Sequence, residues 1–290
     1  MHKPGCINKA LILAAGTGSR LQPLTNQTPK CLTQVGDSTI LYQLISHLRS
    51  VDIRHLVVVI GHKGEQIQRY IETHAPDFSV QWVFNPQYAS TNNIYSLWLA
   101  RHLLNEAFIL LESDLVFDRT QFAGLLLPDR IAISKTQSWM NGSHVELDDS
   151  GIVKRYLSGS ALLQKRQTEI YKTVNIYSFS EITWQRIQKH LHVKIQSGQL
   201  NDYYETVFAD LILQHKLKLA GVMFDPDRWY EIDTLEDLQA AEDRMGDLIV
   251  PPIHSIDYMT TNSLAPLARL PDKPSNAELD TANLEASQWK

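Results

Sequence analysis

Short apolar runs alternate with segments of helical spacing through the first 111 residues of the chain. Leu56–Ile60 (LVVVI) is too short and too apolar for anything but a strand buried on both faces. Residues 39–51 and 65–74 have the spacing of amphipathic helices, and strand-like runs recur at 80–84 and 108–111. A strand, helix, strand order implies right-handed crossovers, so the pattern predicts an α/β fold with a doubly wound, mostly parallel sheet. In such sheets ligands bind at the carboxyl ends of the strands.

The pattern changes after about residue 130. Strand-like runs at 143–147 and 152–156 flank Asp149-Ser150-Gly151, which predicts a β-hairpin with its turn at the glycine. The other expected elements are a strand at 173–179, helices at 181–195 and 204–215, a strand at 218–224 and a helix at 235–244. We therefore expect a second half that belongs to the same sheet and carries the hairpin as an insertion.

The composition excludes several classes of protein. Of the 290 residues 43% are hydrophobic, enough for a large core, and the formal net charge of -5 argues against broad nucleic-acid binding. Two cysteines cannot form a disulfide framework, and no apolar run approaches the roughly 18 residues of a membrane-spanning helix. We expect a soluble, cytoplasmic protein that binds neither nucleic acid nor a membrane.

Prolines are concentrated at the end of the chain. Five of the 12 prolines lie in the last 40 residues, a segment with no glycine and no sustained apolar period. We expect one folded domain at 1–250 and a proline-rich C-terminal tail or linker at 251–290, which would suit a connection to another domain. A tail that packs against the body is the alternative, and a homodimer is left open.

The segment 13–32 (LAAGTGSRLQPLTNQTPKCL) carries most of the information about chemistry. A strand leads into Gly16-Thr17-Gly18, where small residues let the backbone approach a ligand and successive N–H groups can form an anion-binding nest. Arg20 and Lys30 add two cations, of which the first can bind phosphate in a bidentate manner and the second acts as a point charge. These features predict a triphosphate site.

Two common glycine-rich loops do not fit this segment. A dinucleotide-binding loop needs a third glycine at the start of a helix, where this chain has Leu21 and Pro23, and a Walker A loop needs Gly-Lys-Ser/Thr. The pattern G-x-G-x-R-L-x-P-L-T-x-x-x-P-K-x-L instead resembles the nucleotidyltransferase superfamily of sugar-phosphate pyrophosphorylases and small cytidylyltransferases. The resemblance implies a Rossmann-like fold and a triphosphate held by Arg20 and Lys30. It also implies that the loop binds the nucleotide through Leu13, Ala14, Ala15, Gly16 and Gly18.

Phosphoryl transfer between two anions needs a divalent metal ion to offset charge. Mg²⁺ prefers oxygen ligands and usually takes one or two carboxylates. Asp114 follows the apolar run 108–111, and Asp233 precedes the final helix in WYEIDTLEDL. Asp233 has an alternative role as the N-cap of that helix, although Thr234 can supply the cap. The resemblance implies that Asp114 and Asp233 hold Mg²⁺, and with Arg20 and Lys30 they form the predicted catalytic set.

A polar segment, 85–97 (NPQYASTNNIYSL), follows the third predicted strand. Its Thr91 and Asn92 can simply cap the next helix. The spacing N-x-x-Y-x-x-T-N-N-x-x-S-L also resembles the phosphocholine and 2-aminoethylphosphonate cytidylyltransferases. That resemblance implies that Asn85, Thr91 and Asn92 help to bind the base and ribose of a nucleotide. Asn amides can pair with a pyrimidine edge, so the expected nucleotide is CTP.

The second half is expected to bind a small phosphate or phosphonate dianion. Lys172 is the best candidate counter-charge, although a lysine is more often a solvated surface residue. Trp139, Tyr203 and Glu205 are candidates for the acceptor's amine, because aromatic faces attract cations, and core packing is the alternative role of the aromatic residues. A quaternary ammonium has no N–H group and favours an aromatic cage, whereas a primary ammonium has three donors, so Glu205 favours a primary amine.

We therefore expect an Mg²⁺-dependent cytidylyltransferase that joins CMP from CTP to a small amine-bearing phosphonate or phosphate and releases pyrophosphate. The leading acceptor is 2-aminoethylphosphonate, followed by phosphocholine. A sugar-1-phosphate nucleotidyltransferase is the alternative enzyme, and it would need polar residues for sugar hydroxyls. A nucleotide-binding regulatory pseudoenzyme is the alternative of another class, although this chain keeps both cations and both aspartates.

Overall fold

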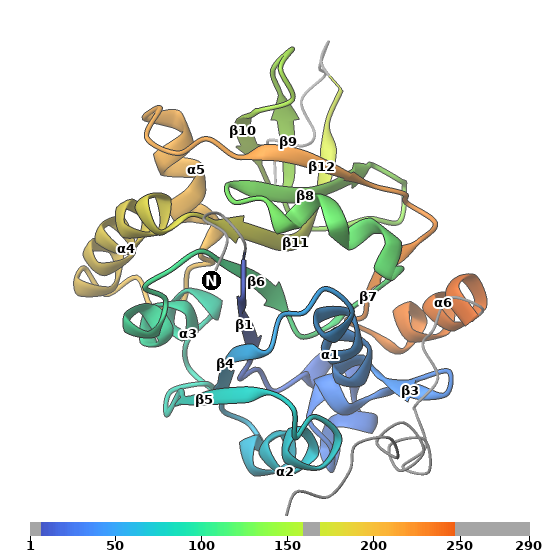
Figure 1. The fold of residues 1–290 in the computed structure, drawn as a ribbon. Helices are drawn as coiled ribbons and strands as arrows, with labels where there is room; N and C mark the ends of the chain where they lie inside the picture. Colours follow the sequence, from blue (N-terminus) through green and yellow to red (C-terminus); the bar gives the residue numbers. More distant parts are fainter. Residues whose placement is uncertain (1–6, 159–168, 247–290) are drawn as a thin grey trace, which may run out of the picture. The chain divides into compact units, whose positions relative to one another are not determined.

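The computed structural model describes residues 7–158 and 169–246 of the chain. Four parallel strands form one side of its main sheet, in the order β6-β1-β4-β5, with β5 at the edge (Figure 1). Their bounds are Lys9–Ala14 for β1, His55–Ile60 for β4, Ser79–Phe84 for β5 and Phe108–Glu112 for β6. Each lies where an apolar run predicts a strand, so the α/β class with a mainly parallel central sheet is confirmed.

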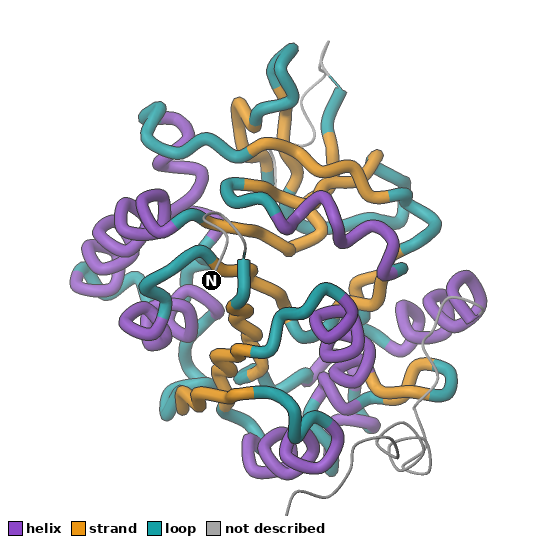
Figure 2. Tube along the Cα trace, in the orientation of Figure 1, coloured by secondary structure: helices purple, strands orange, loops and turns teal. Residues whose placement is uncertain are grey.

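Side chains of β1 alternate between the two faces of the sheet. Ala10, Ile12 and Ala14 belong to one buried core, whereas Leu11 and Leu13 belong to the other. The helices divide in the same way (Figure 2): α1 (Ile40–Ser50) and α2 (Gly64–His74) pack on the first face, and α3 (Asn93–Ala100), α4 (Glu181–Gln196) and α5 (Glu205–Leu213) on the second. The central strands are apolar on both sides because both faces are covered, as a doubly wound sheet requires.

The second half continues the sheet with mixed pairing. Strand β11 (Tyr171–Phe179) runs antiparallel to β9 (His144–Leu147) and β6 along one side and to β8 (Arg130–Lys135) along the other. Strands β9 and β10 (Val153–Leu157) form the expected hairpin, and β12 (Ala220–Phe224) runs parallel to β8. Strand β8 is absent from the sequence-based expectations, because its run RIAISK contains only two isoleucines between polar or small residues.

Short elements around the sheet position the site. Strand β7 (Leu115–Phe117) pairs antiparallel with β13 (Trp229–Glu231), although the two lie far apart in the chain. Strand β2 (Gln34–Val35) pairs with β3 (Ser38–Thr39), and α6 (Leu235–Met245) follows β13. The 3₁₀ helices are η1 (Ser19–Leu21), η2 (Leu24–Asn26), η3 (Lys30–Leu32), η4 (Arg101–Leu103) and η5 (Arg119–Leu126).

Two expectations concern the ends and the surroundings of this domain. The boundary at residue 250 and the tail at 251–290 lie outside the described residues, so the division of the chain remains a prediction. None of the helices within 7–158 and 169–246 has the length and hydropathy needed to cross a bilayer.

Candidate active site

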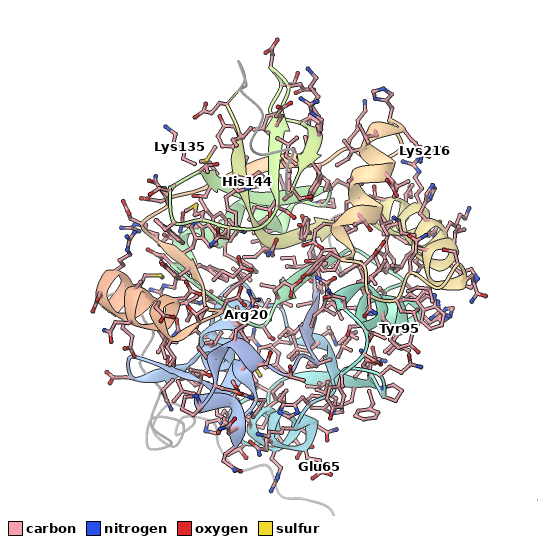
Figure 3. All side chains as sticks on the ribbon, turned by 180° about the vertical axis from the view of Figure 1, so that it is seen from behind. Arg20, Glu65, Tyr95, Lys135, His144 and Lys216 are labelled. Atoms are coloured by element: carbon pink, nitrogen blue, oxygen red, sulfur yellow. The ribbon has the colours of Figure 1, made fainter. Side chains whose placement is uncertain are left out.

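A cavity of about 1070 Å³ opens at the carboxyl ends of β1 and β6, where the sequence predicts the ligand. The loop after β1 forms one wall, the segment between β5 and α3 a second, and residues from the second half the rest. Figure 3 shows Arg20 at this junction between the two halves. Every residue that the sequence assigns to the site lines the cavity: Leu13, Ala14, Ala15, Gly16, Gly18, Arg20, Lys30, Asn85, Thr91, Asn92, Asp114, Trp139, Lys172, Tyr203, Glu205 and Asp233.

The two glycines of the loop, Gly16 and Gly18, differ in the space around them and in the reason why glycine is suited to each position. Gly18 has φ +64°, and a Cβ there would lie 2.9 Å from Cβ of Lys30, so only glycine fits. The Thr25 hydroxyl donates to the Gly18 carbonyl at 2.9 Å, which fixes the turn. At Gly16 an added Cβ would meet no described atom within 4 Å, because this residue faces the open cavity. The loop is therefore packed against Lys30 and Thr25 at Gly18, whereas Gly16 has open space beside it.

The four residues of the predicted catalytic set contact one another. Lys30 Nζ lies 2.7 Å from both Asp114 Oδ2 and Asp233 Oδ1, and Arg20 Nη2 lies 2.7 Å from the same Asp233 oxygen. Burial would lower the pKa of the Lys30 ammonium, but the two carboxylates outweigh it and raise this pKa above its usual value. Burial would raise the pKa of Asp233, but Lys30 and Arg20 lower it. Lys30 and Asp233 are therefore both held in their charged forms.

Backbone pairing brings the two aspartates together. Ile232 N donates to Asp114 O at 2.9 Å, which continues the β7–β13 ladder by one bond. The α6 N-cap is Thr234, whose hydroxyl accepts from Asp237 N while the Asp237 carboxylate accepts from Thr234 N. Asp233 is therefore not the cap of this helix, and its carboxylate is directed to the two cations.

The donor set at this point fits a divalent metal ion. Asp114 Oδ1 is buried and has no hydrogen-bond partner among the described residues, so one carboxylate oxygen is left for a cation. Asp114 and Asp233 both accept a hydrogen bond from the Lys30 ammonium, so the two carboxylates lie close together. The described part of the chain contains no group of three or more His, Cys, Asp or Glu residues arranged for a metal. Two carboxylates suit Mg²⁺, which takes its remaining ligands from phosphate and water.

The predicted nucleotide segment is held by its own hydrogen bonds. The buried Asn85 donates through Nδ2 to Ser96 Oγ at 3.1 Å and to Thr91 Oγ1 at 3.3 Å, and its Oδ1 accepts from Gln87 N at 2.9 Å. Asn92 caps α3 by accepting from Asn93 N at 2.8 Å. Asn92 is therefore the N-cap of α3, as the alternative reading proposes. Asn85 instead shapes the wall of the cavity against which a base would lie. A direct contact of either amide with a base stays a prediction.

Lys172 is buried in the wall of the cavity. Its side chain is 2% exposed, and Nζ donates to Thr173 O at 2.7 Å and to Glu231 Oε2 at 3.2 Å. The ammonium also lies 5.7 Å from the centre of the Trp229 ring. The alternative of a solvated surface lysine is therefore wrong for Lys172, because this charge is held inside the cavity wall.

The predicted aromatic residues do not surround one point. Trp139 stacks on Tyr230 with ring centres 4.4 Å apart and planes 2° apart, and the Arg244 guanidinium carbon lies 5.4 Å from the Trp139 ring centre. Tyr203 is exposed. Trp139 therefore packs largely against the core, which is the alternative role considered for the aromatic residues. It also borders the cavity.

The first part of the chain matches a known protein family. The family model described as nucleotidyl transferase matches residues 9–136, a stretch that includes the loop, Arg20, Lys30 and Asp114. The matched stretch covers less than half of the chain, so its first part is similar to the nucleotidyltransferases. The Asp233 segment lies beyond the matched stretch and joins the site through the β7–β13 pair.

Several proteins similar to this chain are named for small phosphonates or phosphates. The chain is 28% identical over 250 residues to the CMP-5'-(3-aminopropyl)phosphonate synthase of Streptomyces rubellomurinus, covering 82% of this chain but 39% of that protein. It is 28% identical to the 2-aminoethylphosphonate cytidylyltransferase of Lancefieldella rimae, covering 80% and 90%. The solved CTP:phosphocholine cytidylyltransferase of Streptococcus pneumoniae superposes with a TM-score of 0.71 at 25% identity, covering 81% of this chain and 97% of that one.

The cavity is also lined by two glutamates that the sequence reasoning does not assign to the site, Glu112 and Glu231. Burial and the nearby Asp114 raise the pKa of Glu112 well above its usual range, and burial raises the pKa of Glu231 although Lys172 opposes it. Burial likewise raises the pKa of Glu205 to about 7. A signal for the missed pair exists in the sequence: Glu-Ser-Asp ends at Asp114 and Glu-Ile-Asp at Asp233, and a spacing of two puts side chains on one face of a strand.

Proposed function

We propose that the protein is an Mg²⁺-dependent cytidylyltransferase that joins CMP from CTP to a small amine-bearing phosphonate or phosphate. The leading acceptor is 2-aminoethylphosphonate, and phosphocholine is the next. The observation that carries the proposal is the contact of Lys30 with both Asp114 and Asp233, in a cavity that also contains Arg20 and the buried Lys172. The names of three relatives, two phosphonate enzymes and one phosphocholine enzyme, support the choice of acceptor.

The reaction follows from the charges along the cavity. An acceptor oxygen attacks the α-phosphorus of CTP, a new phosphorus–oxygen bond forms, and the bond to the leaving pyrophosphate breaks. Arg20 and Lys30 neutralise charge on the triphosphate and on the departing pyrophosphate, and Lys172 offsets the charge of the acceptor dianion. Asp114 and Asp233 would hold Mg²⁺, which supplies charge neutralisation and orients the phosphate oxygens when bound. Because these groups are fixed before substrate arrives, little reorganisation is needed in the transition state.

A screen of pyrophosphate release tests this function. ATP, CTP, GTP and UTP are each combined with 2-aminoethylphosphonate, phosphocholine or glucose-1-phosphate, with and without Mg²⁺. We expect release that requires Mg²⁺, is fastest with CTP, and is faster with the two amine-bearing acceptors than with glucose-1-phosphate. Preference for glucose-1-phosphate would favour a sugar-1-phosphate nucleotidyltransferase instead. No release with any pair would favour a regulatory pseudoenzyme.

A further inference from the structure

Two glutamates, the half-buried Glu112 and the buried Glu205, face the cavity from different elements. Glu112 ends β6, and Glu205 begins α5. Glu205 is only 9% exposed, and its Oε2 atom is buried without a hydrogen-bond partner in the described part of the chain. Glu112 Oε1 accepts from Asn93 Nδ2 at 3.1 Å. Within residues 7–158 and 169–246, neither glutamate has a lysine or arginine ion-pair partner.

Such an arrangement leaves room for one more cation. A carboxylate buried without a counter-charge is strongly unfavourable in its ionised form, so it keeps its proton unless a positive group with hydrogen-bond donors faces it. Lys172 is a buried cation of the cavity wall, but it already donates to Thr173 O and Glu231 Oε2. The missing positive charge would therefore come from a ligand.

The chemistry of the pocket distinguishes two kinds of ligand cation. A trimethylammonium group has no N–H donor and binds best among several aromatic faces. Here the Trp139 face is covered by Tyr230, and the Trp229 ring has Lys172 near it. Tyr204 is fully buried in the core. A primary ammonium has three N–H donors, and carboxylate oxygens are the acceptors that match them.

We propose that Glu112 and Glu205 form the ammonium subsite of the acceptor and select a primary amine over its N-trimethyl counterpart. This inference rests on the proposed cytidylyltransferase function and names the residues that decide its acceptor. Asn93 acts as a positioning residue, because its Nδ2 donates to Glu112 while its Oδ1 accepts from Tyr204 N at 3.0 Å. One amide thereby joins the end of β6 to the start of α5 and sets the spacing of the two carboxylates.

Paired acceptors test the inference in the wild-type protein and in Glu205→Gln. The first pair is phosphoethanolamine and phosphocholine, which differ only in the three methyl groups on nitrogen. The second is 2-aminoethylphosphonate and ethylphosphonate, which differ only in the amine. We expect kcat/KM to favour the primary amine in both pairs, and Glu205→Gln to reduce each preference by about 10-fold or more, the scale of one charged hydrogen bond. Because each result is a ratio, a general loss of activity cancels.

Three further measurements make the outcome decisive. Glu112→Gln should change the same ratios and replaces the first variant if Glu205→Gln does not fold, whereas Glu65→Gln, an exposed glutamate of α2, should leave both ratios unchanged (Figure 3). Calorimetry should give at least about a 10-fold weaker Kd for 2-aminoethylphosphonate in Glu205→Gln. Unchanged ratios together with an unchanged Kd would overturn the subsite, even with active enzyme. Absence of pyrophosphate release with every acceptor would overturn the proposed function, while the Kd still decides the subsite.

Discussion

Lys30 is the residue on which the site converges. Its ammonium contacts two carboxylates that lie far apart in the sequence, and its Cβ packs against Gly18 of the loop. The same side chain therefore depends on the glycine, on Asp114 and on Asp233. Its charge is stabilised within the site, because the carboxylates raise its pKa more than burial lowers it.

Reversing the charge of Lys30 tests its electrostatic role. Lys30→Glu should reduce kcat/KM for CTP by at least about 100-fold, the scale for loss of one preorganised electrostatic donor. Lys216→Glu, on an exposed lysine far from Arg20, is the control and should have little effect (Figure 3). Pyrophosphate release measures both. A loss at Lys30 no larger than that at Lys216 would count against the role given to Lys30.

The two loop glycines predict different consequences for the same substitution. Gly18→Ala should lower the free energy of unfolding by about 1–2 kcal/mol, because alanine is strained at φ +64° and its Cβ would approach Lys30. Gly16→Ala meets no such atom, so it should preserve stability and instead raise the KM for CTP. Urea unfolding and steady-state kinetics separate the two effects. Equal destabilisation by both substitutions would contradict this reading of the loop.

The raised pKa of Glu205 predicts a pH-dependent stability. The folded state keeps this proton up to about pH 7, whereas an unfolded glutamate loses it near pH 4.5. Stability should therefore fall as the pH rises between these values, by about 3 kcal/mol at most for this group. Glu231, Lys172 and Asn93, which act on Glu205 in the wild type, are unchanged in Glu205→Gln, so the comparison isolates the contribution of this carboxyl group. The difference in unfolding free energy between Glu205→Gln and wild type should grow from pH 4.5 to 7.5, and a constant difference would refute the assignment.

At the scale of elements, two strands of three residues each have the largest consequence for the site. The β7–β13 pair places Glu-Ser-Asp beside Glu-Ile-Asp, and so brings both aspartates to Lys30. Three residues are too few for a periodic pattern, and their pairing depends on tertiary contacts rather than local propensity. Sequence reasoning therefore located Asp114 and Asp233 by motif but did not foresee the ladder that joins them, nor the two glutamates beside them. Long apolar strands such as β4 were predictable because both of their faces are covered.

The capping box of α6 gives a prediction at this scale. Thr234→Ala removes the hydroxyl that accepts from Asp237 N, and should lower the free energy of unfolding by about 1 kcal/mol. Thr234→Ser keeps that oxygen and should lose only a small part of the stability. Thermal or urea unfolding of the three proteins compares them. If serine and alanine were equally destabilising, Thr234 would not be the functional cap, and the orientation of Asp233 would need another cause.

At the scale of the whole domain, the two halves share one cavity and are joined across it. Asn92 N donates to Leu200 O, and Asn93 Oδ1 accepts from Tyr204 N, so the proposed nucleotide wall is bonded directly to the acceptor side. The net charge of -5 does not describe this site, where three cations face a group of carboxylates. Charge specificity in this protein is therefore local, which is why composition excluded a broad nucleic-acid surface without excluding an anionic substrate.

Replacement of one carboxylate tests the central claim most directly. Turnover of CTP and 2-aminoethylphosphonate with saturating Mg²⁺ is measured for wild type, for Asp233→Asn and for Asp243→Asn, an exposed aspartate of α6 that serves as the matched control. We predict that Asp233→Asn lowers kcat by about 100-fold or more while Asp243→Asn stays close to wild type. Near-wild-type turnover by Asp233→Asn would contradict the metal assignment and, with it, the proposed arrangement of the active site.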